Sequence, residues 1–178
     1  MLQDFIESIE KLIDARLGDV HTAVPAEIVE FNQDDSTVDV VPKAKVVLSS
    51  GTEYDYPRIN RVPLLFPCGS MLDASIVFPV KKGDGCLLIF SEQSLEYWKG
   101  LGITSSEMKF ELSNAIAIPG LFAKPSSDIK EAIEKDSVII RNGDNKISLS
   151  KSKIAITGDI VLEGNLTLTG EIKTSHNE

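Results

Sequence analysis

The sequence predicts a mainly β protein that consists of an N-terminal helix, a small barrel, a short helical connector and a C-terminal β-helix intertwined from three copies. Three observations predict this class. Apolar residues recur at helical spacing near the start, short alternating segments separated by Pro and Gly follow, and a glycine recurs every six residues near the end. We expect the domains at residues 1–18, 19–122, 123–136 and 137–178.

Composition narrows the classes of partner. The 178 residues carry a formal net charge of −9, and phosphate binding needs clustered Lys and Arg, so the charge argues against a nucleic-acid partner. No apolar run approaches the roughly 18 residues of a membrane span. At the N-terminus, no basic region precedes an apolar segment. We therefore expect a protein that is made in the cytoplasm without a signal peptide.

The N-terminal helix is predicted from an apolar stripe formed by Leu2, Phe5, Ile6, Ile9, Leu12, Ile13 and Leu17. Acidic residues occupy most of the opposite side, and Gly18 ends the pattern. Two interpretations stay open. The helix packs on its own domain, or it docks on a neighbouring subunit, since it lies outside the β-region that follows.

Short strands with turns are predicted over residues 20–122. In the segment TVDVVP, for example, the alternation predicts that Val38 and Val40 point inward and that Thr37 and Asp39 point outward. Five or six strands in about a hundred residues suit a small barrel, and the five-stranded OB barrel is a natural candidate.

Two local features within this region are predicted to be structural. Cys68 and Cys86 lie beside apolar, strand-like residues and lack the spacing of a disulfide framework or a metal site, so we expect reduced core thiols. The segment KKGDG lacks the spacing of a P-loop. It is predicted to be a tight turn, in which Gly83 and Gly85 supply positive φ between the strands SIVFPV and CLLIF.

The connector is predicted from Pro125 and the two serines that follow it, which break the chain. The segment DIKEAIEK after them can form at most two helical turns. The β-pattern then resumes with SVIIRNGDNKISLSKSKIAITGD.

The end of the chain aligns on its glycines as the hexads SKIAIT, GDIVLE, GNLTLT and GEIKTS. Positions three and five are apolar until Thr174, so each hexad predicts a short strand with one buried face and a turn residue at position one. Repeats of this kind need several stacked units for stability, and a single chain of this length would form little more than two coils.

Three copies wound together remove this difficulty, because each layer then takes one strand from each chain and leaves no free sheet edge. A hexapeptide acyltransferase helix is a competing trimeric fold, but it usually carries one aliphatic residue per hexad and runs for many coils. The residues predicted to face the common axis are Ile154, Ile156, Ile160, Leu162, Leu166, Leu168 and Ile172.

Catalytic patterns are weak in this sequence. The two histidines are His21 and His176, and His21 is part of no Ser-His-Asp or Cys-His pattern. No pair of carboxylates is marked out as acid and base. We therefore expect that the protein is not an enzyme, and a trimeric enzyme that uses His21 is a third hypothesis. A three-fold axis would bring together three copies of His176, which makes this residue a candidate metal ligand.

Several motifs recur here in the order of a known family: HTAVPAEIVEFN with TVDVVP, then RVPLLFP, PVKKGDGCLLIFSEQSLEYW and SNAIAIPGL. With them, the chain resembles the trimeric central spike of contractile tails, the phage baseplate assembly protein V group. It is most similar to the branch in which an OB-fold domain is followed directly by a β-helix. The matching pieces are a GDxGLLxF-like segment at residues 83–90, a helix ending in Trp at residues 91–98 and an AIxIPG turn at residues 115–120.

The resemblance implies a structural homotrimer in a virion or tail-like particle, at the centre of the baseplate. It would link a baseplate hub protein to the tip, pierce the target cell envelope on sheath contraction and contact the target cell membrane transiently. The hub-facing side of the N-terminal helix would include Phe5, Ile9 and Leu12. Spike tips of this family often carry a His-x-His pair that binds iron, whereas His176 stands alone in TSHNE. An axial iron or other metal ion is one candidate for the tip, and a separate PAAR-like tip protein is another.

The alternative function is an OB-fold nucleic-acid-binding protein with a trimerising tail. Aromatic residues make up 6% of the chain and are not interleaved with basic residues, as single-strand binding would need. The net charge of −9 also disfavours this alternative.

Overall fold

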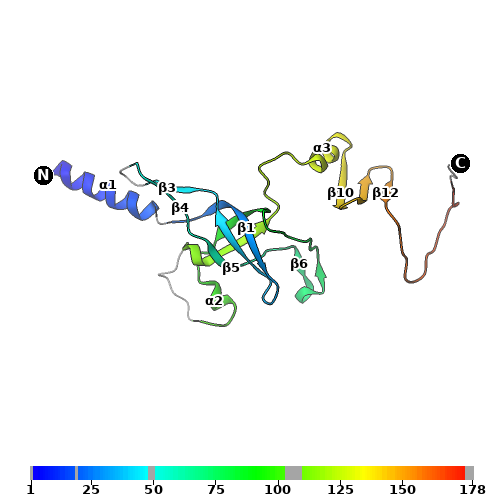
Figure 1. Cartoon of the computed structure of the whole chain (residues 1–178), viewed down its shortest axis with the longest axis horizontal. Helices are drawn as coiled ribbons and strands as arrows, with labels where there is room; N and C mark the ends of the chain where they lie inside the picture. Colours follow the sequence, from blue (N-terminus) through cyan, green and yellow to red (C-terminus); the bar gives the residue numbers. More distant parts are fainter. Residues whose placement is uncertain (1, 19, 48–50, 103–109, 175–178) are drawn as a thin grey trace. The chain divides into compact units, whose positions relative to one another are not determined.

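The computed structural model describes residues 2–18, 20–47, 51–102 and 110–174. The chain divides into two compact units, Met1–Lys124 and Pro125–Glu178, and each is described by itself. The first unit begins with the helix α1 (Leu2–Gly18), which confirms the predicted helix and its end at Gly18 (Figure 1).

The main element of the first unit is a curled, half-barrel sheet of five strands. Its strand order is β5-β2-β1-β8-β9, and each strand is antiparallel to its neighbours. The two edges of the sheet approach each other, because Leu64 and Ala117 form a parallel bridge and the Leu65 N–H donates to the Ala117 carbonyl at 2.9 Å. The strands are β1 (Ala23–Asn32), β2 (Thr37–Pro42), β5 (Ile59–Pro63), β8 (Gly85–Phe90) and β9 (Ala115–Pro119).

The inner face of the half-barrel is filled with side chains, and this is the hydrophobic core. Val38 and Val40 are fully buried, as predicted. Thr37 and Asp39, which were predicted to point outward, are buried as well, so burial along β2 does not alternate. Cys86 is also fully buried, as predicted, and burial raises the pKa of its thiol to about 11. The buried hydrophobic residues are Ala26, Ile28, Val38, Val40, Ile59, Val62, Cys86, Leu88, Phe90, Ala115 and Ala117.

Cys68 does not lie in this core, so its prediction as a core thiol is wrong. It is exposed in the two-residue strand β6 (Cys68–Gly69). Within the residues that the structure describes, β6 pairs only with β7 (Ala74–Ser75), across the 3-10 turn η1 (Ser70–Leu72). These two short strands form a sheet separate from the half-barrel, and two strands of two residues each are too short to form a buried face. Apolar neighbours in the sequence therefore did not imply burial.

The strand predicted for SIVFPV is also wrong. Only its first residue belongs to a strand, β7, and residues 76–80 form none. The Ile76 N–H donates to the Pro67 carbonyl at 2.9 Å, but Pro67 and Pro79 have no N–H with which to extend a ladder.

The turn predicted at residues 81–85 is confirmed, although its two glycines differ in role. Gly83 has φ of +95°, and its N–H donates to the Ile28 carbonyl at 2.8 Å. Gly85 has no positive φ and instead opens β8. A Cβ at Gly85 would overlap with the backbone carbonyl oxygen of Leu121, so this position needs glycine for space rather than for conformation.

The remaining elements in the described residues of the first unit are short. They are the hairpin of β3 (Lys45–Val47) and β4 (Glu53–Asp55), the helix α2 (Leu95–Trp98) and the 3-10 turn η3 (Leu112–Asn114). The helix that the resemblance implies at residues 91–98 is therefore limited to its last turn. Ser91, the first residue of that range, is not helical. Its N–H donates to the Asn114 carbonyl at 3.0 Å.

The second unit contains one helix and a three-stranded antiparallel sheet in the order β10-β11-β12. The helix α3 (Ser127–Glu134) forms the two turns expected of the connector. It begins after Ser126, whose hydroxyl accepts a hydrogen bond from the Asp128 N–H at 3.2 Å. The strands are β10 (Ser137–Asn142), β11 (Asn145–Ser150) and β12 (Ile154–Thr157).

The hexads only partly follow the prediction. The first hexad supplies β12, but β12 pairs with β11 of the same chain rather than with another copy. No residue of 158–174 belongs to a strand, so a C-terminal β-helix is not seen in the part of the chain that the structure describes. Gly158 and Gly164 have positive φ, as expected for turn positions, whereas Gly170 does not.

Candidate functional site

The first candidate site is an uncovered apolar face on the sheet of the second unit. The strand register places Val138 opposite Leu149, and Leu149 opposite Ile154. It likewise places Ile140, Ile147 and Ile156 in a second row. Directly opposed residues share one face of a sheet. All six side chains are between 37% and 66% exposed, so this face, which we call the apolar sheet face, is bare in the single chain.

The helix α3 covers the opposite, polar face of the same sheet. Glu131 of α3 accepts hydrogen bonds from Lys146 and Lys135, each at 2.9 Å, and lies 3.5 Å from Arg141. Asp128 forms a second ion pair with Arg141 at 2.8 Å. The hydrogen bonds from Lys146 and Lys135 lower the pKa of Glu131 to about 2. Charged contacts thus hold α3 on one face and leave the apolar face uncovered.

In its described residues, 125–174, the second unit has no buried hydrophobic core of its own. The buried hydrophobic residues all lie between Ala26 and Ala117, in the half-barrel. Among the described residues 125–174, every large hydrophobic side chain is at least partly exposed. A unit this small needs buried apolar area to be stable, and here the single chain does not supply it. The apolar sheet face is therefore a surface that requires a cover.

The residues predicted to face the axis of a trimer lie in two different environments. Ile154 and Ile156 belong to β12 and form part of the apolar sheet face. The structure gives the others, which follow β12, no strand partner, and each is more than half exposed: Ile160, Leu162, Leu166, Leu168 and Ile172.

The apolar stripe of α1 is exposed as well. Phe5, Ile9 and Leu12, which were predicted to face a hub protein, are between 40% and 62% exposed. A helix of this length is marginal in isolation, and most helical stability in proteins comes from packing of an apolar face. That a hub protein covers this stripe remains a prediction.

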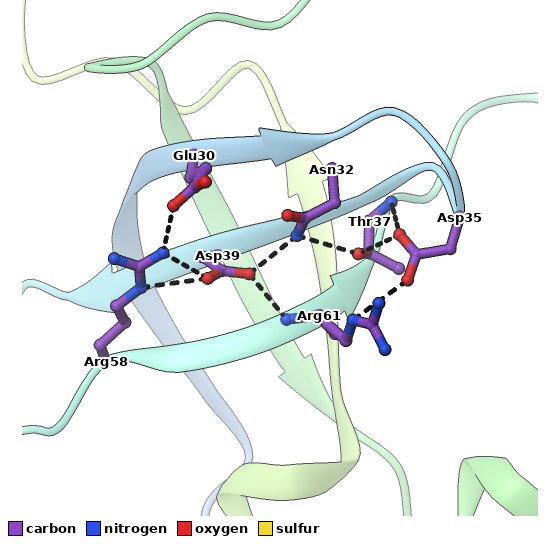
Figure 2. Close-up of polar contacts among 7 residues, drawn as sticks. All are labelled: Glu30, Asn32, Asp35, Thr37, Asp39, Arg58 and Arg61. Atoms are coloured by element: carbon purple, nitrogen blue, oxygen red, sulfur yellow. Dashed lines mark hydrogen bonds and ion pairs between the residues drawn. The ribbon is translucent and has the colours of Figure 1, made fainter.

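The second candidate site is a polar network centred on Asp39 in β2. The Asp39 side chain is almost fully buried, and the residue is 7% exposed. Its Oδ1 accepts from Asn32 Nδ2 and from the Arg61 backbone N–H, each at 2.9 Å. Its Oδ2 accepts from Arg58 Nε at 3.1 Å and from Arg58 Nη2, which also bonds Glu30. Figure 2 shows Asp39 between the two arginines, with β1 and β5 on its two sides.

The two strands that pair with β2, which are β1 and β5, each have a β-bulge opposite Asp39. On β1, the extra residue Val29 lies between the partners of Val40 and Asp39. On β5, Asn60 and Arg61 together lie opposite Asp39, and Arg61 has φ of +55°. A bulge disrupts the ladder locally and increases the bend of a sheet. The Asp39 carboxylate accepts the Arg61 N–H that the bulge frees, so it stabilises the curl of the half-barrel.

A second carboxylate extends this network to the β1–β2 turn. Asp35 Oδ1 accepts from the Thr37 hydroxyl at 2.6 Å, and Asp35 Oδ2 lies 3.4 Å from Arg61 Nε. The Thr37 hydroxyl in turn accepts from Asn32 Nδ2 at 3.2 Å (Figure 2). The bond from Thr37 lowers the pKa of Asp35.

The charge state of Asp39 is set by two opposing effects. Burial is the largest and raises its pKa, but the hydrogen bonds from the Arg61 N–H, Arg58 and Asn32 together outweigh it, so the pKa lies below the ordinary value of 3.8. Its partner Arg58 has a raised pKa, because it donates to Asp39 and Glu30. The network therefore contains three carboxylates and two arginines, and through Asp39 it joins β2 to β1 and β5.

The sequence analysis placed Asp39 on an outward face but missed this network. Alternation predicts the face of β2 from which a side chain projects. It does not predict which residues cover that face. The partners Arg58 and Arg61 lie about twenty residues further along the chain, after the β3–β4 hairpin. An acidic residue inside a valine-rich strand was the one available signal.

Of the two histidines, His21 lies in the described part of the chain. The ring of His21 packs against Tyr56 and Phe90, with centroids 5.7 and 5.6 Å away. His176, the candidate metal ligand, lies outside the described residues. Within the residues that the structure describes, no three His, Cys, Asp or Glu side chains gather as a potential metal site. No helix in the described part of the chain has the length and hydropathy of a membrane span.

The fold defines the first unit as a small β domain with a side-chain-filled half-barrel. The family model of the phage protein Gp138 N-terminal domain matches residues 24–120, which extend from β1 to the end of β9 and make up more than half of the chain. The chain therefore belongs to this family of phage proteins. A comparison with curated proteins finds no match. The match supports the phage origin that the resemblance implied and a structural role in the phage.

Proposed function

We propose that the chain is the central spike of a contractile-tail baseplate, assembled as a homotrimer that links the hub to the tip. The observation that carries this proposal is the apolar sheet face. Its six aliphatic side chains are in register, and α3 covers the other face. A soluble chain rarely leaves such a surface bare unless a partner covers it.

Three copies are a suitable cover for this face. Three identical sheets that turn their apolar faces to a common axis bury all of them in one closed assembly, with no copy left unpaired. Fully burying an aliphatic side chain stabilises by about 1.5–3 kcal/mol. Because these six are already partly covered, their burial would contribute on the order of 5–10 kcal/mol per chain before the cost of association.

The first unit supports the same proposal through its strand order. A five-stranded antiparallel sheet that curls until its first and last strands meet in parallel is the arrangement of an OB-type barrel, and here Leu64 and Ala117 form that contact. We propose that this barrel, together with the exposed stripe of α1, docks on the baseplate hub protein. An OB-type barrel alone does not indicate function. The family match to a phage protein favours this role over nucleic-acid binding.

The proposed role is mechanical and needs no catalytic group. Strands that pair between copies cannot unravel without separating the copies, which favours a high unfolding barrier. A spike driven through a cell envelope, with transient contact to the target membrane, needs that kinetic stability. A metal ion at His176 and a PAAR-like tip protein stay proposals for the apex.

Labelling of intact particles tests this function directly. Gold-conjugated antibodies raised against the chain would be bound to purified particles and viewed by electron microscopy. We expect label at the baseplate end of the tail, in particles whose baseplate has been opened by sheath contraction. Label on the capsid, or no label on contracted particles that contain the chain by mass spectrometry, would contradict the proposed location.

A further inference from the structure

The short helix α2 is attached to the half-barrel at its start. Ser94, which precedes the helix, and Asn114 are both buried, and the Leu95 N–H donates to Asn114 Oδ1 at 3.4 Å. Asn114 leads directly into β9 of the half-barrel sheet. A buried polar side chain restricts the position of the group that it binds, because leaving it unpaired costs free energy. The sheet therefore determines where α2 begins.

The other end of α2 is closed by a Schellman motif. The Gly100 N–H donates to the Tyr97 carbonyl at 3.0 Å, and the Leu101 N–H donates to the Glu96 carbonyl at 2.8 Å. Gly100 has φ of +73°, which is the left-handed conformation that this motif requires. A helix of four residues would not be stable in isolation, but here both of its ends are fixed. Its side chains therefore project in defined directions.

The side chains that project from this turn into solvent are large and apolar. Tyr97 is 56% exposed, Trp98 81% and Leu101 76%. Single exposed apolar residues are common on protein surfaces, whereas these three lie within five consecutive residues and form a patch. Tyrosine and tryptophan are among the residues that most often carry the binding energy of protein interfaces. We call these three residues the α2 anchor.

We propose that the α2 anchor is the surface by which the barrel binds another protein, and that this partner receives Trp98 in an apolar pocket with a basic rim. A rigid anchor suits a preformed pocket, because little conformational entropy is then lost on binding. The inference rests on the proposed function, in which the barrel docks on the baseplate hub protein. It assigns that contact to one surface of the barrel.

The charges around the α2 anchor favour a basic protein surface over two other occupants. The charged residues in the range 91–102 are Glu92, Glu96 and Lys99, and all three are exposed. An anionic membrane surface would repel this acidic edge. A second copy would also repel it, since it carries the same net charge of −9. Lys or Arg side chains around a pocket would instead attract the edge and orient the anchor.

Fluorine NMR of the full chain tests this contact at the tryptophan itself. Incorporation of fluorotryptophan gives a single resonance, because Trp98 is the only tryptophan of the chain. The shift of this resonance between light and heavy water reports whether solvent reaches the ring. In the chain alone, we expect the full solvent shift, since Trp98 is 81% exposed. Addition of the purified, unlabelled hub protein of the same phage should abolish it.

Affinity for the same hub protein gives a second readout, measured by biolayer interferometry. Trp98→Ala should weaken binding on the order of 30-fold or more, as expected of a dominant interface residue. Its circular dichroism should not change, because the side chain is not part of the core. Tyr97→Ala should also weaken binding. Its matched control is Tyr54→Ala, which should bind as the wild type does, since Tyr54 of β4 is likewise 56% exposed but lies outside the anchor.

Three results would overturn the inference. A hub protein that binds while the fluorine resonance keeps its solvent shift would place the contact elsewhere on the chain. A solvent shift that is already lost in the chain alone would mean that a second copy covers Trp98. A solvent shift that is lost with vesicles of phosphatidylethanolamine and phosphatidylglycerol, and not with the hub protein, would assign the anchor to lipid. A chain that does not bind the hub protein at all would instead contradict the proposed function itself.

Discussion

Leu166→Asp is expected to yield a monomer where the wild-type chain yields a trimer. Leu166 occupies the third position of its hexad and is exposed in the single chain. In the proposed trimer, it would place three carboxylates in one layer around a dry axis. Each buried, unpaired charge costs several kcal/mol, and the three also repel one another. Light scattering coupled to size-exclusion chromatography would measure the mass of the variant.

Thr167→Asp is the matched control, because it adds the same charge one residue further along the same hexad. Alternation in a strand directs position 167 away from the axis, toward water. This variant should assemble as the wild type does. A trimeric Leu166→Asp, or a loss of assembly that is equal in both variants, would contradict the buried axis.

Asp39→Asn is expected to destabilise the half-barrel by about 2–3 kcal/mol, because hydrogen bonds to a buried charged group are lost. An amide can accept at its oxygen only, so its NH2 group would face N–H donors of Arg58 or Arg61. The bulge in β5 would lose a charged acceptor, and Arg58 would lose its buried partner. Urea unfolding of the full chain, followed by near-ultraviolet circular dichroism, measures the change.

Glu30→Gln is the control for this substitution, since Glu30 bonds the same Arg58 but is exposed to solvent. An exposed ion pair contributes at most about 1 kcal/mol, so this variant should remain close to wild type. Equal destabilisation by the two variants would show that the arginine matters and the buried carboxylate does not.

The pH dependence of stability follows from the direction of the Asp39 shift. The pKa of Asp39 in the folded state lies below 3.8, so the folded state holds its charged form more strongly than the unfolded state does. The stabilisation is therefore fully present above the ordinary pKa and is lost as the pH falls through the folded pKa. As the pH is lowered below about 5, the unfolding free energy of Asp39→Asn should fall less steeply than that of the wild type.

Much of the fold follows from local patterns in the sequence. The stripe of α1, the burial of Val38 and Val40, and the Gly83 turn each depend on residues close together in the chain, so their spacing is sufficient. The two turns of α3 follow from composition in the same way. Of these elements, β2 and the Gly83 turn belong to the half-barrel, and α3 covers the polar face of the sheet in the second unit.

The parts that sequence reasoning missed depend on partners distant in the chain. Apolar neighbours predicted burial for Cys68, but β6 pairs with one short strand outside the sheet. Periodicity grouped β12 with the later hexads, although β11 lies beside it and pairs with it first. Asp39 binds Arg58 and the Arg61 N–H, and the bulge between β2 and β5 places these groups beside it. This register depends on the pairing of distant segments.

The mass of the wild-type chain in solution tests the central claim most directly. Multi-angle light scattering on the purified protein at micromolar concentration would suffice. The bare apolar sheet face and the exposed aliphatic residues of 158–174 predict three times the chain mass of 19.4 kDa. A stable species of 19.4 kDa would contradict the account, because both surfaces would then remain in water.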